Sequence, residues 1–358
     1  MPRSKIIGPQ GTLSRSLDDL GLAADIKDTG RRNLIINGGM RVAQRGSSTT
    51  TNGYGSLDRF IVSHNNMDNL AFTFAQDTDG PSGFSNSLKY TVTTAESALA
   101  SDEIARVMHR IEGLNMQRTG WGTSSAKALT LSFYVKSSVT GTYAVEFRMN
   151  SGGSNSLSKN YTINSANTWE RKTMTFPANT ATAFVNTKLE ACEIGWYLAA
   201  GTNYSGGTLA STYGSNPTNS RAAGQTANVL ATNGNTWYLT GAQLEVSDSA
   251  SDFEHRGIGE ELRECQRYYQ KSTGYALALA NASTTGYTYR QERTQISSLK
   301  VIMRDSPAFT ATTGISTLSG GVELIGSVDF VIVKPASYAS DIPSTAYWYG
   351  GYEADAEL

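Results

Sequence analysis

Apolar and polar residues alternate with a period of two along much of this chain, which is the pattern of β-strands that bury one face. The clearest case is LTLSFYV at residues 129–135, where leucine, phenylalanine and valine alternate with threonine, serine and tyrosine. Polar turns separate such segments, and short strands at this spacing predict an antiparallel β-sandwich or barrel. The strands expected before residue 256 are 34–36, 59–63, 70–76, 87–92, 105–111, 128–136, 143–149, 158–163, 169–176, 193–198 and 236–245.

One segment, residues 237–271, changes period part of the way along. Its first part alternates as a strand, with a slip at Gly241 where we expect a β-bulge. After a polar turn, Leu262, Cys265 and Tyr269 are spaced as i, i+3 and i+7, which is one face of a helix. The segment therefore predicts a strand that closes one unit and a short helix that leads into the next.

These patterns divide the chain into four parts: an N-terminal arm at 1–30, a large β-unit at 31–255, a linking helix within 256–272 and a smaller β-unit at 273–358. We expect an all-β protein, with a short helix in the arm over residues 16–24. The strands expected in the smaller unit are 275–280, 287–290, 294–302, 322–324, 328–334 and 346–352.

Composition narrows the possible partners. The formal charges nearly cancel, with 30 Lys and Arg against 31 Asp and Glu, so no basic surface for nucleic acid is expected. No apolar run reaches the ~20 residues that cross a bilayer, and the N-terminal residues lack an apolar signal segment. We therefore expect neither membrane insertion nor a secretory signal.

The two cysteines, Cys192 and Cys265, make no disulfide framework and are expected to be buried thiols.

Motifs for catalysis and metal binding are few. His64, His109 and His255 have no metal-ligand spacing, and no Walker, GxGxxG or GxSxG pattern occurs. Glycoside hydrolysis needs only two suitably placed carboxylates, which a sequence does not exclude, so a polysaccharide depolymerase stays an alternative to the expected non-enzyme. DTDG at 77–80 is a fragment of a calcium loop, so structural calcium stays an alternative to a plain acidic turn, and no other cofactor is expected.

Aromatic rings are the side chains that stack on the apolar faces of sugars. We consider four rings as candidates for a carbohydrate site: Trp121, Tyr204, Tyr213 and Trp348. Trp121 lies between glycines, Tyr204 and Tyr213 lie in a long polar stretch at 203–235, and Trp348 lies in a cluster of tyrosines. Three further tryptophans stand in expected strands and are predicted to be core residues: Trp169, Trp196 and Trp237.

Several segments together resemble tail-fibre and other virion surface proteins of tailed bacteriophages. They are NLIINGGMRVAQRG at 33–46, LDRF at 57–60, AKALTLSFYVKS at 126–137, GAQLEV at 241–246, FEHR at 253–256, GEELRECQRYYQK at 259–271, KVIMRDSPAF at 300–309 and EADAEL at the end of the chain. The combination is more specific than any one segment. It spans about residues 31 to 358 and leaves the arm outside the resemblance.

The resemblance implies a jelly-roll-like sandwich similar to carbohydrate-binding modules. It also implies a homotrimeric fibre or surface appendage that adheres to host-surface glycan, with the arm docked on other phage virion proteins. Such a protein is made in the host cytoplasm and released by lysis on the particle surface. Two alternatives remain: a purely structural head-decoration or tail assembly protein, and a depolymerase. Depolymerases of this kind commonly use long parallel β-helices, and the chain shows no coil repeat.

Overall fold

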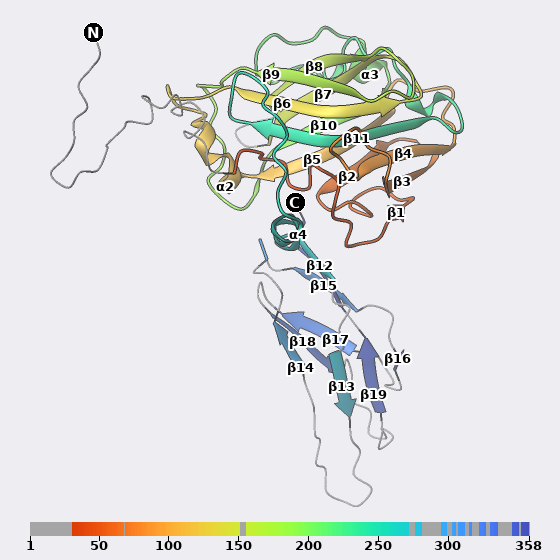
Figure 1. The fold of residues 1–358 in the computed structure, drawn as a ribbon, viewed down its shortest axis with the longest axis vertical. Coiled ribbons are helices and arrows are strands. Elements are labelled where there is room, and N and C mark those ends of the chain that lie inside the picture. Colours follow the sequence, from red (N-terminus) through yellow and green to blue (C-terminus); the bar gives the residue numbers. More distant parts are fainter. Residues whose placement is uncertain are drawn as a thin grey trace, which may run out of the picture.

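Two antiparallel sheets stack face to face in the larger part of the protein, and smaller sheets lie beyond a short helix (Figure 1). The computed structural model describes residues 31–67, 69–150, 155–271, 276–280, 295–298, 303–305, 307–311, 315–316, 322–326, 330–335, 346–350 and 352–357. This architecture confirms the all-β, jelly-roll-like sandwich with a linking helix and a smaller C-terminal β-unit. The predictions for the arm at 1–30 and the strand at 287–290 lie outside the described residues.

The larger sheet has six strands, and every neighbouring pair is antiparallel. Their spatial order is β1 (Ser48–Thr49), β3 (Ala71–Asp77), β4 (Ser87–Thr94), β11 (Thr236–Glu245), β6 (Leu129–Ser137) and β9 (Glu170–Phe176). Since β11 is late in the sequence but lies between β4 and β6, the sheet is complete only when distant parts of the chain have met.

The second sheet has five strands, also antiparallel throughout. Their order is β2 (Phe60–Asn65), β5 (Ile104–Glu112), β10 (Glu190–Ala200), β7 (Gly141–Met149) and β8 (Asn155–Ile163). Short helical turns complete the connections: α2 (Gly113–Met116), η2 (Gln117–Thr119), α3 (Thr202–Ser205), η3 (Thr218–Ser220) and η4 (Val229–Ala231).

The core lies between the two inner faces. Phe133 and Val135 of β6 point into it and are fully buried, as the alternation predicts. Trp196 of β10 and Trp237 of β11 are also fully buried, so two of the three strand tryptophans are core residues. Each large apolar side chain removed from water in this way stabilises the fold by roughly 1.5–3 kcal/mol. Cys192 lies in the same core as a free thiol.

The predicted bulge in β11 is present. Pairing with β6 shifts register between Thr240 and Gln243, and Gly241 adopts a positive φ of 59°. Because of this shift, Leu239 before the bulge and Ala242 after it both face the core, although they are three positions apart, an odd spacing that would put them on opposite faces of a regular strand. The bulge therefore keeps the apolar side of the strand continuous across the slip.

Residues 34–36 form a turn rather than the expected strand. The reason is the two asparagines that flank them. The Asn33 carboxamide accepts the amide N–H of Ile35 at 2.9 Å and donates to the carbonyl oxygen of Ala242 at 3.0 Å. The Asn37 carboxamide accepts the Val42 N–H at 3.0 Å and donates to the Val42 carbonyl oxygen at 2.8 Å. Leu34 keeps one backbone hydrogen bond to β11, from its N–H to the Leu244 carbonyl oxygen at 2.8 Å, while the N–H groups of Ile35 and Val42 bind asparagine side chains.

Helix α4 (Ile258–Gln266) follows the sandwich, and Cys265 on its inner face is buried as a free thiol. The helix is shorter than the sequence pattern indicates. Tyr269, placed on the helix by its spacing, instead begins β12 (Tyr269–Lys271) and pairs with Asp355 of a C-terminal strand. Backbone hydrogen bonds to that distant strand override the local helical spacing. None of the helices in the described ranges is long and apolar enough to cross a membrane.

Three small antiparallel sheets make up the described C-terminal part. The first sheet has the order β12, β20 (Tyr352–Asp355) and β15 (Ala308–Ala311). The second has the order β13 (Ala276–Ala280), β19 (Ala346–Gly350) and β16 (Ile315–Ser316). The third has the order β14 (Gln295–Ser298), β18 (Phe330–Pro335) and β17 (Val322–Gly326). The first of these sheets lies next to α4, below the sandwich in Figure 1. It therefore forms the seam between the two units.

A buried ion pair crosses this seam. The Arg59 side chain is fully buried at the start of β2, and its guanidinium binds the carboxylate of Glu357, which follows β20. The same guanidinium donates to the carbonyl oxygen of Arg110 at 2.7 Å and lies 3.5 Å from the centre of the Tyr268 ring. A buried charge needs such partners, because its loss of hydration is otherwise uncompensated.

We expect Glu357→Gln to lower the free energy of unfolding by about 3 kcal/mol, because it leaves Arg59 buried without its counter-charge. The matched control is Glu353→Gln on the same sheet. Glu353 pairs with Lys271 at 2.9 Å, but both side chains are about one-third exposed, so the loss should stay below about 1 kcal/mol. Urea denaturation of both variants measures the difference, and equal losses would contradict the role given to Arg59.

Candidate functional site

Two of the four aromatic residues selected from the sequence meet inside the sandwich. Trp121 is only 4% exposed, and its ring centre lies 4.9 Å from that of Phe184 and 5.1 Å from that of Tyr213. The Trp121 indole N–H donates to the carbonyl oxygen of Lys127 at 2.7 Å, so its one polar atom is satisfied in the interior. The expectation that the Trp121 loop presents an exposed ring is therefore corrected: Trp121 and Tyr213 pack together in the core.

The other two candidates lie elsewhere. Tyr204, in α3, is half-buried against the outer side of the five-stranded sheet, and the Arg221 guanidinium lies 5.9 Å from its ring centre. Trp348 lies in β19 and pairs with Ala278 and Ser316, but its side chain is outside what the structure describes. The structure thus brings Trp121 and Tyr213 together and does not join Tyr204 to them.

The outer face of the six-stranded sheet gathers partly exposed rings instead. Tyr134 points outward because its neighbours in β6 point into the core. The others come from the loop before β4, the turn before β9 and the segment after β11. We call these five residues the aromatic band: Phe84, Tyr134, Trp169, Phe253 and His255. His255 is exposed and the other four are half-buried.

At one end of the band, Trp169 lies over a row of cross-strand neighbours. Tyr238 of β11 pairs with Lys89 of β4 on one side and with Lys136 of β6 on the other. The Trp169 ring centre is 6.0 Å from that of Tyr238 in an edge-on arrangement, and the Lys136 ammonium lies 4.0 Å from the centre of the Tyr238 ring. Cation–π contacts of this kind fix the rings in place.

At the other end of the band, Phe84 is the central ring. Its centre lies 5.3 Å from that of Tyr134, 5.0 Å from that of Phe253 and 5.2 Å from that of His255. Gly241 makes this packing possible. A Cβ atom at Gly241 would lie 2.7 Å from Cζ of Phe84 and 3.0 Å from Cδ2 of Tyr134. The bulge in β11 thus serves the outer face as well as the core.

Polar groups border the Trp169 end. The Asp79 carboxylate accepts the Trp169 indole N–H at 3.0 Å and binds the Lys136 ammonium. The hydrogen bonds from Lys136 and Trp169 lower the pKa of Asp79. Burial opposes ionisation of Asp77, but hydrogen bonds from the Asp79 amide and from Lys89 lower its pKa overall. Both acids of the DTDG segment therefore have lysine partners, and no described residues form a three-ligand metal cluster.

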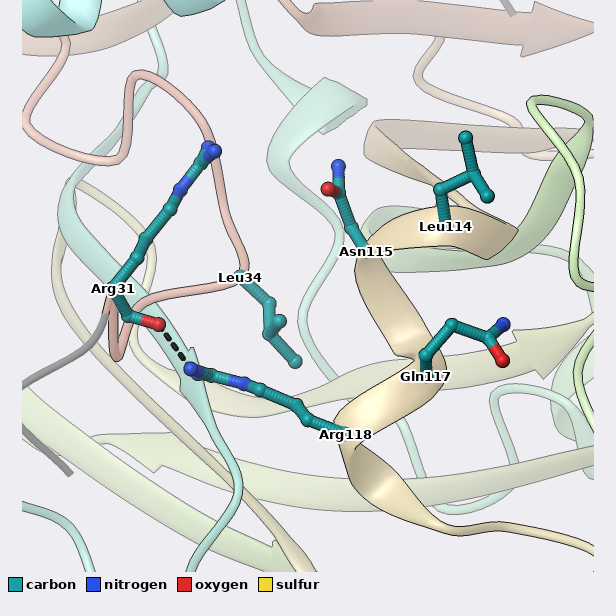
Figure 2. A pocket seen from close by; sticks show the side chains of 6 residues that line it. All are labelled: Arg31, Leu34, Leu114, Asn115, Gln117 and Arg118. Carbon is teal, nitrogen blue, oxygen red and sulfur yellow. Dashed lines mark hydrogen bonds between the residues drawn. The ribbon is translucent and has the colours of Figure 1, made fainter. Parts of the chain in front are cut away.

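A hollow lies beside residue 31, where the described part of the chain begins (Figure 2). Its volume is about 280 Å³, and Leu34 and Leu114 form its apolar walls. Arg118 reaches across it and donates to the carbonyl oxygens of Arg31 and Arg32. No aromatic ring lines this hollow, so among the described residues it suits a sugar less well than the band does.

The rings that sequence reasoning missed have identifiable signals. Trp169 was predicted to be a core residue because it stands at the start of the expected strand 169–176. It instead ends a polar turn in which Asn167 has a positive φ of 55°, and β9 begins one residue later. The polar run before Trp169 was the available signal. Phe253 and His255 belong to FEHR and contact the distant ring of Phe84, a placement that has no local signature in the sequence.

Comparisons with protein-family models and with curated proteins give no match. Among solved structures, the chain is similar to the enzymatically active domain of bacteriophage CBA120 tailspike protein 4, with 14% identity, 60% of this chain and 21% of that chain covered, and a TM-score of 0.33. It is also similar to a family 11 carbohydrate-binding module from Clostridium thermocellum in complex with a mixed-linked tetrasaccharide. There the identity is 9%, the coverage is 58% and 98%, and the TM-score is 0.29.

A third similar structure is TmCBM61 in complex with β-1,4-galactotriose, with 8% identity, 61% of this chain and 100% of that chain covered, and a TM-score of 0.30. The chain thus spans only about a fifth of the tailspike chain but all or nearly all of the two modules. At TM-scores this low, the similarities carry no argument about the site.

We expect Gly241→Ala to disturb the band from beneath. The new methyl group meets both Phe84 and Tyr134, and the positive φ adds about 1 kcal/mol of backbone strain. The matched control is Gly234→Ala, where φ is 84° but nothing lies within 4 Å of the added Cβ. Thermal unfolding measures the loss of stability from backbone strain in both variants. Near-ultraviolet circular dichroism reports displacement of the aromatic rings, which is expected only for Gly241→Ala. Identical changes in both variants would contradict the packing role of Gly241.

Proposed function

We propose that this chain is a non-enzymatic bacteriophage virion protein, a fibre or surface appendage, that binds host-surface glycan through the aromatic band. Several segments of the chain resemble tail-fibre and other virion surface proteins of tailed bacteriophages, and this resemblance supports the virion role. The band supports the binding role. In this proposal the protein is made in the host cytoplasm, is released by lysis and acts on the surface of the phage particle.

One observation carries the glycan proposal: half-buried and exposed rings gather over the outer face of the six-stranded sheet, beside hydrogen-bonding groups that ion pairs hold in place. A pyranose has apolar C–H faces that pack on such rings and hydroxyls that need donors and acceptors at the edge. Trp169 supplies a half-buried ring, while Asp79 and Lys136 supply polar atoms beside it. Such a site needs little ordering on binding, because ion pairs and strand pairing already hold its parts.

The charges around the band favour binding over catalysis. A glycoside hydrolase needs a general acid whose pKa is raised so that it keeps a proton. At the band the pKa values of Asp77 and Asp79 are lowered, so both carboxyls are ionised at neutral pH. Release of reducing sugar from a host polysaccharide by the purified protein would instead support the depolymerase alternative.

We expect Trp169→Ala to weaken glycan binding about fivefold to tenfold, since a stacked ring contributes on the order of 1 kcal/mol. An array of bacterial envelope saccharides followed by titration of the strongest binder measures this. Tyr204→Ala is the control, because Tyr204 is a half-buried aromatic residue outside the band. If only Tyr204→Ala weakens glycan binding, the site lies at Tyr204, one of the candidates chosen from the sequence. Absence of any glycan binder would favour the purely structural alternative.

The proposed assembly is a homotrimer whose arm docks on other virion proteins. The C-terminal part consists of small sheets, and units of that size commonly need a partner to bury enough surface. We expect a chain lacking residues 1–30 to remain a soluble trimer that is no longer incorporated into particles. Multi-angle light scattering tests whether the truncated chain is a trimer, and an incorporation assay tests whether it still joins phage particles. A stable monomer contradicts the trimer, and normal incorporation contradicts the docking role of the arm.

A further inference from the structure

The hollow beside residue 31 lies where the N-terminal arm joins the described chain (Figure 2). Leu34, in the turn that follows the arm, and Leu114, in α2, form its apolar walls. Leu114 is 49% exposed. A single exposed leucine is ordinary, but this one borders a concave surface of about 280 Å³ that another apolar segment can fill.

The polar edge of the hollow is basic. Arg31 and Arg118 line it beside two amide side chains, and none of the described lining residues is acidic. Arg31 pairs with Glu264 of α4 at 2.8 Å. Arg118 donates to the carbonyl oxygens of Arg31 and Arg32, which are neutral acceptors. The hollow thus combines apolar walls with guanidinium groups at its edge, and it suits an apolar segment that carries acidic residues.

One segment of this chain has the complementary chemistry. Residues 16–25 of the arm, which lie outside the described residues, read SLDDLGLAAD. Leu17, Leu20 and Ala24 are spaced as one face of a helix, and the segment holds three aspartates but no lysine or arginine. Its sequence therefore predicts an apolar stripe with a net negative charge beside it, which matches the walls and the edge of the hollow.

This segment needs a surface in order to form a helix. A helix of about ten residues is marginal alone in water, and Gly21 weakens it further. The hollow is within reach, because Ala24 precedes Arg31 by seven residues, which span about 23 Å when extended. A tether this short gives an effective concentration on the order of millimolar. The tether therefore favours the hollow of the same chain over that of a second copy.

We propose that residues 16–24 dock as a helix in the hollow beside residue 31 of their own chain. The leucines of the stripe pack against Leu34 and Leu114. Asp18 and Asp25, which share one flank of the stripe at a spacing of i and i+7, face Arg118. The docked arm is a state of the protein before it joins a particle, and it depends neither on glycan binding nor on the proposed virion role.

Amide hydrogen exchange of the full-length protein, followed by mass spectrometry of peptides that cover residues 16–24, tests this docking. We expect exchange there to be about tenfold slower than in a synthetic peptide of residues 1–30, because docking stabilises the helical hydrogen bonds. Leu114→Gln puts a polar group on the wall of the hollow, so it should speed the exchange of this segment about fivefold to tenfold.

The matched control is Leu189→Gln. Leu189 is 58% exposed but does not line the hollow, so its replacement should leave exchange at residues 16–24 unchanged. Both leucines are about half exposed, and neither change should unfold the sandwich. Exchange as fast as in the free peptide overturns the proposal, as does an equal effect of the two variants.

A mixing experiment separates the arm's own hollow from that of a second copy. Full-length Leu114→Gln protein is mixed with a chain that lacks residues 1–30 and keeps an intact hollow. We expect the arm to stay unprotected in the mixture, because its own hollow is altered. Protection that returns on mixing would assign the hollow to the arm of a neighbouring copy and overturn docking within one chain.

Discussion

The buried charge of Arg59 is the constraint on which the arrangement of the two units depends. Its guanidinium has no contact with solvent, and its compensation comes from Glu357, the Arg110 carbonyl and the Tyr268 ring. Glu357 is supplied by the far end of the chain. If the C-terminal strand left the seam, an unpaired cation would remain in an apolar site at a cost of several kcal/mol. The ion pair therefore fixes where the smaller unit attaches.

The proposed glycan site is the aromatic band on the outer face of the six-stranded sheet. The band is a surface feature whose rings are held by a bulge, by edge-on contacts and by lysines, so its binding power comes from stacking.

Much of the fold was predictable because it follows local periodicity. The alternation in β6 places Phe133 inward, and the slip at Gly241 marks a real bulge. The failures are non-local: Tyr269 leaves its helix to pair with β20, and Trp121 turns inward because the Lys127 carbonyl satisfies its indole. The candidate site was least predictable. Its rings come from four segments that share a face only after β11 has entered the sheet between β4 and β6.

The network around residues 31–42 has a mechanical consequence. Arg31 forms an ion pair with Glu264 of α4 at 2.8 Å, and the Asn33 amide donates to Glu254 at 2.8 Å. The chain therefore enters the sandwich and leaves it through parts that are bonded directly to each other. Tension applied between the arm and the C-terminal unit passes through these short contacts and α4, and it bypasses the strand pairs that carry the rings. A force of this kind would load the contacts around residues 31–42 while the aromatic band kept its shape.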